Sequence, residues 1–131
     1  MKKLDSAHPT WRAIAADDDE SSLLLVCAAL DLFAVAVYEA RNGLEVLELL
    51  TKIVPPTFIL LDISMPKLDG WETLEQIKAT PAWSNIPVIA LTAYALDSER
   101  ERARTSGFSA YLIKPLSPSA LIAEIERIVR E

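Results

Sequence analysis

Five short apolar runs alternate with five segments of helical character along this chain of 131 residues. The runs are almost continuously apolar, as in Phe58-Ile59-Leu60-Leu61. Strands of this kind are buried on both faces, and strands that alternate with helices form a parallel sheet with helices on both sides. The pattern therefore predicts one α/β domain, a doubly wound (βα)5 sandwich with a five-stranded parallel sheet.

The expected boundaries follow from apolar periodicity and from residues that start or end helices. Asp69 and Ser98 each precede a glutamate by three residues, which predicts N-caps, and Ser117 followed by Pro118 predicts another. The expected strands are residues 12–16, 33–38, 57–61, 87–91 and 110–113. The expected helices are residues 21–32, 44–53, 69–80, 98–107 and 119–130.

The composition fits one globular domain over residues 11–131, preceded by a tail at residues 1–10 that includes His8. A net charge of −6 with scattered basic residues disfavours direct binding of nucleic acid. The longest apolar stretch, residues 23–38, is interrupted by Asp31 and is shorter than the roughly 20 residues that span a membrane. The single cysteine, Cys27, is expected to be a buried structural thiol in a reducing, cytoplasmic compartment.

Polar residues follow the ends of four predicted strands. Asp17 and Asp18 follow the first strand, Asp62 the third and Lys114 the fifth, and Thr92 ends the fourth. In a parallel sheet these ends share one edge, and ligands bind there where the strand order reverses. Under a flavodoxin-like strand order, 2-1-3-4-5, the first and third strands flank that point. The three aspartates are therefore expected to converge.

Three neighbouring carboxylates repel one another, and a bound cation is the simpler of the usual resolutions. Oxygen ligands without nearby histidine or cysteine favour a hard ion, and we expect Mg²⁺. A carboxylate can also attack phosphorus and form an aspartyl phosphate, a role that suits the central Asp62. Phosphoryl transfer depends on positioning and charge neutralisation, which Lys114 and Thr92 can supply.

The order and spacing of four motifs resemble the receiver domains of bacterial-type response regulators over nearly everything from Trp11 to Glu131. A lone acidic pair or a lone Lys-Pro is common on surface loops, whereas the four motifs together are specific. The motifs are Asp17-Asp18, Leu60-Leu61-Asp62-Ile63-Ser64-Met65-Pro66 leading to Asp69-Gly70, Ala90-Leu91-Thr92-Ala93 and Tyr111-Leu112-Ile113-Lys114-Pro115.

The resemblance implies a phosphorylation site built around Asp62 as the phosphoacceptor. It implies that Asp17 and Asp18 hold Mg²⁺ together with Asp62 and the backbone carbonyl of Ser64. Lys114 would form an ion pair with the phosphoryl oxygens. Such a domain is not an enzyme acting on a separate substrate, although it promotes its own phosphorylation and dephosphorylation.

The resemblance also implies a two-state switch. Thr92 would turn toward the phosphoryl group, Tyr111 would move from exposed to buried, and the Lys114-Pro115 peptide bond would be cis. The signalling face would comprise the last two helices and the strand between them. The implied partners are a histidine kinase or phosphotransfer protein and a downstream effector protein or output domain, with a homodimer as a further option.

Other interpretations compete with these assignments. A metal-dependent hydrolase could use Asp62 as its nucleophile, but such phosphatases place a second aspartate where this chain has Ser64. A flavin or nucleotide binder would need a glycine-rich turn after the first strand, which is absent. Tyr111 could simply pack in the core. The unusually apolar helix 21–32 could dock a partner or a second copy, or could bury more than one face in the core.

Overall fold

The computed structural model describes residues 7–129, which form one parallel sheet of five strands and five helices in strict alternation. The strands are β1 (Arg12–Ala16), β2 (Ala36–Ala40), β3 (Phe58–Leu61), β4 (Val88–Thr92) and β5 (Ala110–Ile113). The helices are α1 (Glu20–Asp31), α2 (Gly43–Lys52), α3 (Gly70–Ala79), α4 (Asp97–Ser106) and α5 (Pro118–Val129). The strand order β2-β1-β3-β4-β5 confirms the predicted flavodoxin-like topology.

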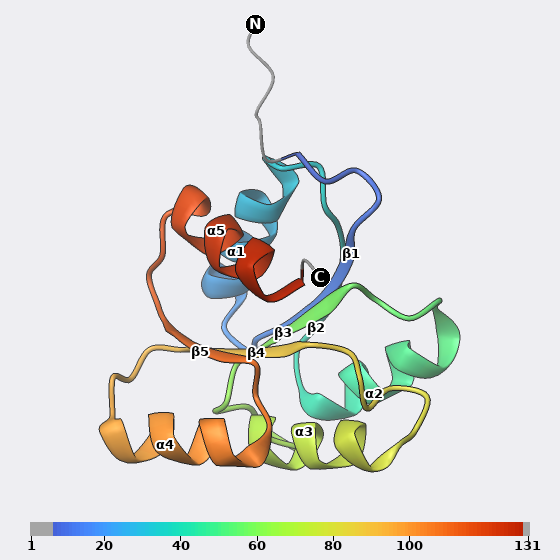
Figure 1. The fold of residues 1–131 in the computed structure, drawn as a ribbon, viewed down its shortest axis with the longest axis vertical. Coiled ribbons are helices and arrows are strands. Elements are labelled where there is room, and N and C mark those ends of the chain that lie inside the picture. Colours follow the sequence, from blue (N-terminus) through green and yellow to red (C-terminus); the bar gives the residue numbers. More distant parts are fainter. Residues whose placement is uncertain (1–6, 130–131) are drawn as a thin grey trace, which may run out of the picture.

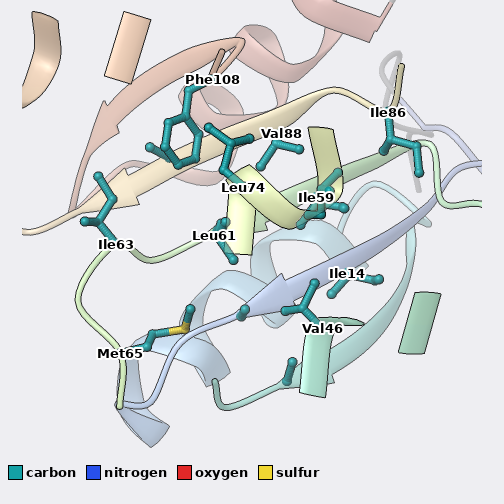
Figure 2. Close-up of a cluster of buried hydrophobic side chains, with 14 of the residues drawn as sticks. Ile14, Val46, Ile59, Leu61, Ile63, Met65, Leu74, Ile86, Val88 and Phe108 are labelled. Atoms are coloured by element: carbon teal, nitrogen blue, oxygen red, sulfur yellow. The ribbon is translucent and has the colours of Figure 1, made fainter. Parts of the chain in front are cut away.

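Helices cover both faces of the sheet, with α1 and α5 on one face and α2, α3 and α4 on the other (Figure 1). The four residues of β3 alternate between the two faces. Ile59 and Leu61 belong to the core under α2 and α3, where they meet side chains such as Val46 and Leu74 (Figure 2). Phe58 and Leu60 belong to the core under α1 and α5. All four β3 side chains are buried, as the continuous apolar run predicts.

The second strand begins three residues later than predicted, at Ala36. The backbone N–H groups of Phe33 and Val35 both donate to the carbonyl of Leu30, and Ala34 has a φ of 65°. Phe33 is buried in the core, so its apolar character serves the turn after α1 rather than a strand. A buried aromatic residue looks the same in the sequence in either role.

Two of the three predicted helix N-caps are confirmed. The Asp69 carboxylate accepts the N–H of Glu72 in a capping box, and the Ser117 hydroxyl accepts the N–H of Ala120 at 3.2 Å. The prediction for α4 was wrong, because the capping position is Leu96, which offers no side-chain hydrogen bond. Ser98 already lies within the first turn of α4 and therefore cannot cap the helix.

The apolar helix α1 buries only one face. Leu23 and Leu30 are in the core, whereas Leu24 and Leu25 are 65% and 70% exposed. The expectation for Cys27 was also wrong, because this thiol is only half-buried, with its Sγ atom 3.7 Å from the Glu39 carboxylate. Burial and that carboxylate raise the pKa of Cys27 to about 11. The thiol is therefore protonated near neutral pH.

His8, expected in a tail, lies against the domain. The backbone N–H of His8 donates to the Phe33 carbonyl at 2.7 Å. Its ring stacks on the Trp11 ring with the centroids 3.5 Å apart, and its Nε2 lies 2.7 Å from a Glu126 carboxylate oxygen. Residues 1–6 of the expected tail lie outside the described residues, as does residue 130 of the last predicted helix. None of the helices within residues 7–129 has the length and hydropathy needed to span a membrane.

Candidate functional site

Three aspartates converge at the carboxyl ends of β1 and β3, as predicted. These strands are neighbours in register, and the N–H of Asp62 donates to the Ala16 carbonyl at 3.0 Å. Asp17 and Asp62 are buried, whereas Asp18 is exposed. One carboxylate oxygen from each of the three lies within 4.8 Å of the others. The sheet topology thus brings together side chains that are 45 residues apart in the sequence.

Lys114 reaches the same site from the end of β5. Its ammonium nitrogen Nζ lies 2.8 Å from Asp17 Oδ2, 2.9 Å from Ser22 Oγ and 3.8 Å from Asp62 Oδ2. Its backbone N–H donates to the Thr92 carbonyl at 2.7 Å, which fixes the lysine beside β4. The Lys114-Pro115 peptide bond is cis, as the resemblance implies.

Sequence reasoning missed Ser22. This serine lies in the first turn of α1, directly after the acidic run, where a serine is commonly just solvated. The only available signal was its position one helical turn beyond the acidic pair. An apolar groove of about 420 Å³ between α1 and α5 ends beside Ser22 and Lys114, with Leu25 and Leu121 among its lining residues.

The two buried carboxylates differ in charge balance. Burial first, and then the charge of Asp17, raise the pKa of Asp62 to about 7, although Lys114 opposes the shift. Burial also raises the pKa of Asp17, but hydrogen bonds from Lys114 and from the Asp19 N–H outweigh it, so that pKa is lowered overall. The Lys114 ammonium thus lies closer to Asp17, at 2.8 Å, than to Asp62, at 3.8 Å, and neutralises Asp62 less completely.

The donor set fits a hard divalent cation. Asp17, Asp18 and Asp62 offer only oxygen ligands, and one lysine does not balance three carboxylates. A cation at this place would offset the two effects that raise the pKa of Asp62, which are first its burial and then the negative charge of Asp17. The Ser64 N–H donates to Asp62 Oδ1 at 3.4 Å, while the metal-binding role of its carbonyl stays a prediction.

Gly70 explains why the loop after Asp62 can fold back on itself. The Gly70 N–H donates to the Ile63 carbonyl at 2.8 Å. A Cβ atom at Gly70 would lie 2.7 Å from the Ile63 Cα and 2.8 Å from the Asp62 carbonyl oxygen. Only glycine permits this close backbone approach, which places the start of α3 against the acidic site.

The two predicted switch residues are both buried. Thr92 is 2% exposed, and its hydroxyl accepts the N–H of Tyr94. The Tyr111 hydroxyl lies 2.8 Å from the Tyr94 carbonyl and 2.9 Å from a Glu99 carboxylate oxygen, and Arg100 lies 5.0 Å above the ring. Tyr111 also packs in the core, as the simpler interpretation held. Its predicted movement between exposed and buried positions stays a prediction.

Comparison with known proteins gives a consistent result. The family model for the response regulator receiver domain matches residues 13–126. The polar-differentiation response regulator DivK of Brucella anthropi is 34% identical over 110 residues, which cover 84% of this chain and 89% of DivK. The sensor histidine kinase CheAY of Helicobacter pylori is 33% identical over 131 residues, or 98% of this chain and 16% of the kinase.

A solved structure shows the same fold with an ion in place. The receiver domain of the sensor histidine kinase PA1611 from Pseudomonas aeruginosa superposes with a TM-score of 0.83 at 26% identity. The match covers 91% of this chain and 97% of that domain, which has a magnesium ion coordinated in its active-site cleft.

Proposed function

This chain belongs to the family of response regulator receiver domains, and from that premise we propose that Asp62 accepts a phosphoryl group from a histidine kinase or phosphotransfer protein. The main supporting observation is that Asp62 is a buried carboxylate that lies beside Asp17 and 3.8 Å from the Lys114 ammonium. A carboxylate oxygen of Asp62 attacks phosphorus as the bond from phosphorus to the donor's imidazole nitrogen breaks. The departing nitrogen keeps the electron pair of that bond.

We propose Mg²⁺ as the cofactor, held by Asp17, Asp18, Asp62 and the backbone carbonyl of Ser64. When bound, the ion supplies positive charge that offsets the charge of the phosphoryl oxygens. The pairing of β1 with β3 places Asp17 and Asp18, which follow β1, beside the acceptor Asp62, which follows β3. Lys114 supplies a second positive charge from the end of β5.

The proposed output is a change of the face formed by α4, β5 and α5. Thr92 would turn to the phosphoryl group and Tyr111 would follow, which would alter binding of an effector protein or output domain. This proposal is supported by the contacts of Tyr111 with Tyr94 and Glu99, because they join β5 to the start of α4. A homodimer and a cytoplasmic location stay predictions.

The test is the intact mass of the protein after incubation with Mg²⁺ and acetyl phosphate. We expect about one phosphoryl adduct per chain in the wild type and in Asp31→Asn, a matched change at an exposed aspartate of α1. We expect none in Asp62→Asn, because the nucleophilic oxygen is lost. An adduct in Asp62→Asn, or none in a wild type that binds Mg²⁺, would refute the proposal.

Receiver domains are signalling domains rather than enzymes with a separate substrate. No feature of residues 7–129 favours the alternative of a metal-dependent hydrolase, since Ser64 stands where a second catalytic aspartate would be needed. We propose that the same residues, Asp62, Lys114 and Thr92, also promote hydrolysis of the aspartyl phosphate.

A further inference from the structure

We propose that Ser22 is a positioning residue for phosphoryl transfer to Asp62. In this proposal, the Ser22 hydroxyl holds the Lys114 ammonium so that one of its N–H groups stays available on the side of Asp62. The inference rests on the proposed function, because it assigns a role within that reaction to a residue outside the family motifs quoted above.

The geometry of the ammonium carries the argument. A lysine ammonium has three N–H donors. Asp17 Oδ2 at 2.8 Å and Ser22 Oγ at 2.9 Å accept two of them. Asp62 Oδ2, at 3.8 Å, is too far for a third hydrogen bond. Within residues 7–129 the third donor is therefore left for an acceptor on the Asp62 side, which is where a phosphoryl oxygen would arrive.

Ser22 also provides an anchor that does not compete with the metal. Asp17 is expected to bind Mg²⁺, and a carboxylate shared between the ion and the ammonium holds the lysine less firmly. A serine hydroxyl is neutral and is a poorer ligand for this ion than the aspartates around it. Ser22 would therefore keep Lys114 in place even where Asp17 also served as a ligand of the ion.

The two anchors come from different elements. Ser22 lies in the first turn of α1, Asp17 directly follows β1, and Lys114 directly follows β5. Lysine has a long flexible side chain that loses conformational freedom when it is held in one place. Two fixed acceptors from two elements restrict the ammonium more than one acceptor can. A hydroxyl at position 22 is therefore useful beyond its effect on helix α1.

The experiment compares side chains of matched shape. Ser22→Thr keeps a hydroxyl, and Ser22→Val introduces a side chain of nearly the same shape as threonine but without the hydroxyl. Ser22→Ala removes the hydroxyl with the smallest change in the rest of the side chain. Ser21→Ala is the control, because Ser21 lies in the same turn but is exposed. The phosphorylation rate with acetyl phosphate at saturating Mg²⁺ is measured by intact mass, and Mg²⁺ affinity is measured separately by titration calorimetry.

We expect Ser22→Ala and Ser22→Val to phosphorylate about 10-fold more slowly, the loss expected for a hydrogen bond to a charged group. Ser22→Thr and Ser21→Ala should stay near the wild-type rate. The dissociation constant for Mg²⁺ should change by less than about two-fold, since Ser22 acts on the lysine and not on the ion. In a Lys114→Ala background, removing the Ser22 hydroxyl should have no further effect.

Several outcomes would overturn the inference. Equal rates for Ser22→Val and Ser22→Thr would show that the hydroxyl is not used. An undiminished effect in the Lys114→Ala background would show that Ser22 acts by another route. A wild-type protein that takes up no phosphoryl group at all would instead refute the proposed function, so the two failures are distinguishable.

Discussion

The two ends of the sheet differ sharply in the side chains that they bury. At the carboxyl ends of the strands, Asp17 and Asp62 are buried beside Lys114. At the amino ends, the Trp11 ring is stacked under His8 and meets Phe58 edge-on at 5.9 Å. One end carries buried charge, and the other is closed by aromatic packing.

The difference follows from the parallel arrangement of the strands. Every strand ends at the same edge, so polar residues placed just after the strands must gather there. Buried charge destabilises a fold unless it is compensated, and Asp62 is incompletely compensated, as its raised pKa shows. At the amino-terminal end, the His8–Glu126 pair is partly exposed and the rings of Trp11 and Phe58 pack together, so this end can be optimised for stability. Changes at the two ends should therefore have opposite effects on stability.

The largest effect on stability is expected for Asp62→Asn. The pKa of Asp62 is raised from 3.8 to about 7, so protonation of this group favours the folded state. This contribution is fully present below about pH 4 and is lost as the pH rises through about 7. Without divalent ions at pH 8, Asp62→Asn should be more stable than the wild type by roughly 1 to 4 kcal/mol. Urea unfolding in a chelator measures it.

The pH dependence of the stability difference shows whether Asp62→Asn stabilises the fold by removing a buried charge or only by better packing. The advantage of Asp62→Asn should shrink as the pH falls toward 4, where the wild-type carboxyl is protonated in the folded protein. Adding Mg²⁺ at pH 8 should also reduce the difference, because the ion binds the folded wild type. A difference that is the same at every pH would mean that the two ends of the sheet do not differ in buried charge as proposed.

The next largest effect is expected on the reaction, for Lys114→Ala. Loss of the ammonium should lower the phosphorylation rate on the order of 100-fold, or about 3 kcal/mol, because a charge-neutralising group is removed. Some Mg²⁺ binding should remain, since the three aspartates are intact. Lys52→Ala, at an exposed lysine of α2, is the control. A rate for Lys114→Ala equal to the wild type would contradict the role of this lysine.

At the opposite end of the sheet, Trp11→Ala should affect stability alone. Trp11 is half-buried between His8 and Phe58, so its loss should lower the free energy of unfolding by about 2 kcal/mol. The phosphorylation rate of the folded protein should stay unchanged. Urea unfolding and intact mass provide the two measurements. A slower phosphorylation of folded Trp11→Ala would instead show that the two ends are coupled.

The group of polar residues at the carboxyl ends of the strands was predictable because the sheet topology alone brings these residues together. Asp17, Asp62 and Lys114 each follow an apolar run, and parallel strands bring such positions to one edge whatever the details of packing. Asp69 was predictable as a helix cap because its partner Glu72 lies only three residues away. Rules that depend on short sequence distances or on strand order are readable from one sequence.

Contacts between distant elements were not predictable in the same way. His8 meets Glu126 across 118 residues, and Ser22 meets Lys114 across 92, and no local pattern marks either pair. Phe33 was assigned to a strand because burial in a turn and burial in a strand select the same side chains. The exposure of Leu24 and Leu25 was also not readable, since an apolar helix is normally buried.

The smallest effect is expected for Tyr111→Phe, which tests whether the charged end communicates with α4. Burial, followed by the hydrogen bond with Glu99, raises the pKa of Tyr111, so its hydroxyl stays protonated. Only one proton is available for the Tyr94 carbonyl and the Glu99 carboxylate, so they compete for it. Removing the hydroxyl should lower the free energy of unfolding by about 1 kcal/mol.

The same variant distinguishes a switch residue from a core residue. Tyr111→Phe should take up the phosphoryl group at the wild-type rate, because its hydroxyl does not touch Asp62 or Lys114. The changes in amide chemical shifts that phosphorylation causes along α4 should become smaller, because the link from β5 to the first turn of α4 is lost. Tyr38→Phe, on β2 at the other edge of the sheet, is the matched control. If α4 responds equally in Tyr111→Phe and the wild type, then Tyr111 only packs in the core, and the charged end acts on α4 by another route.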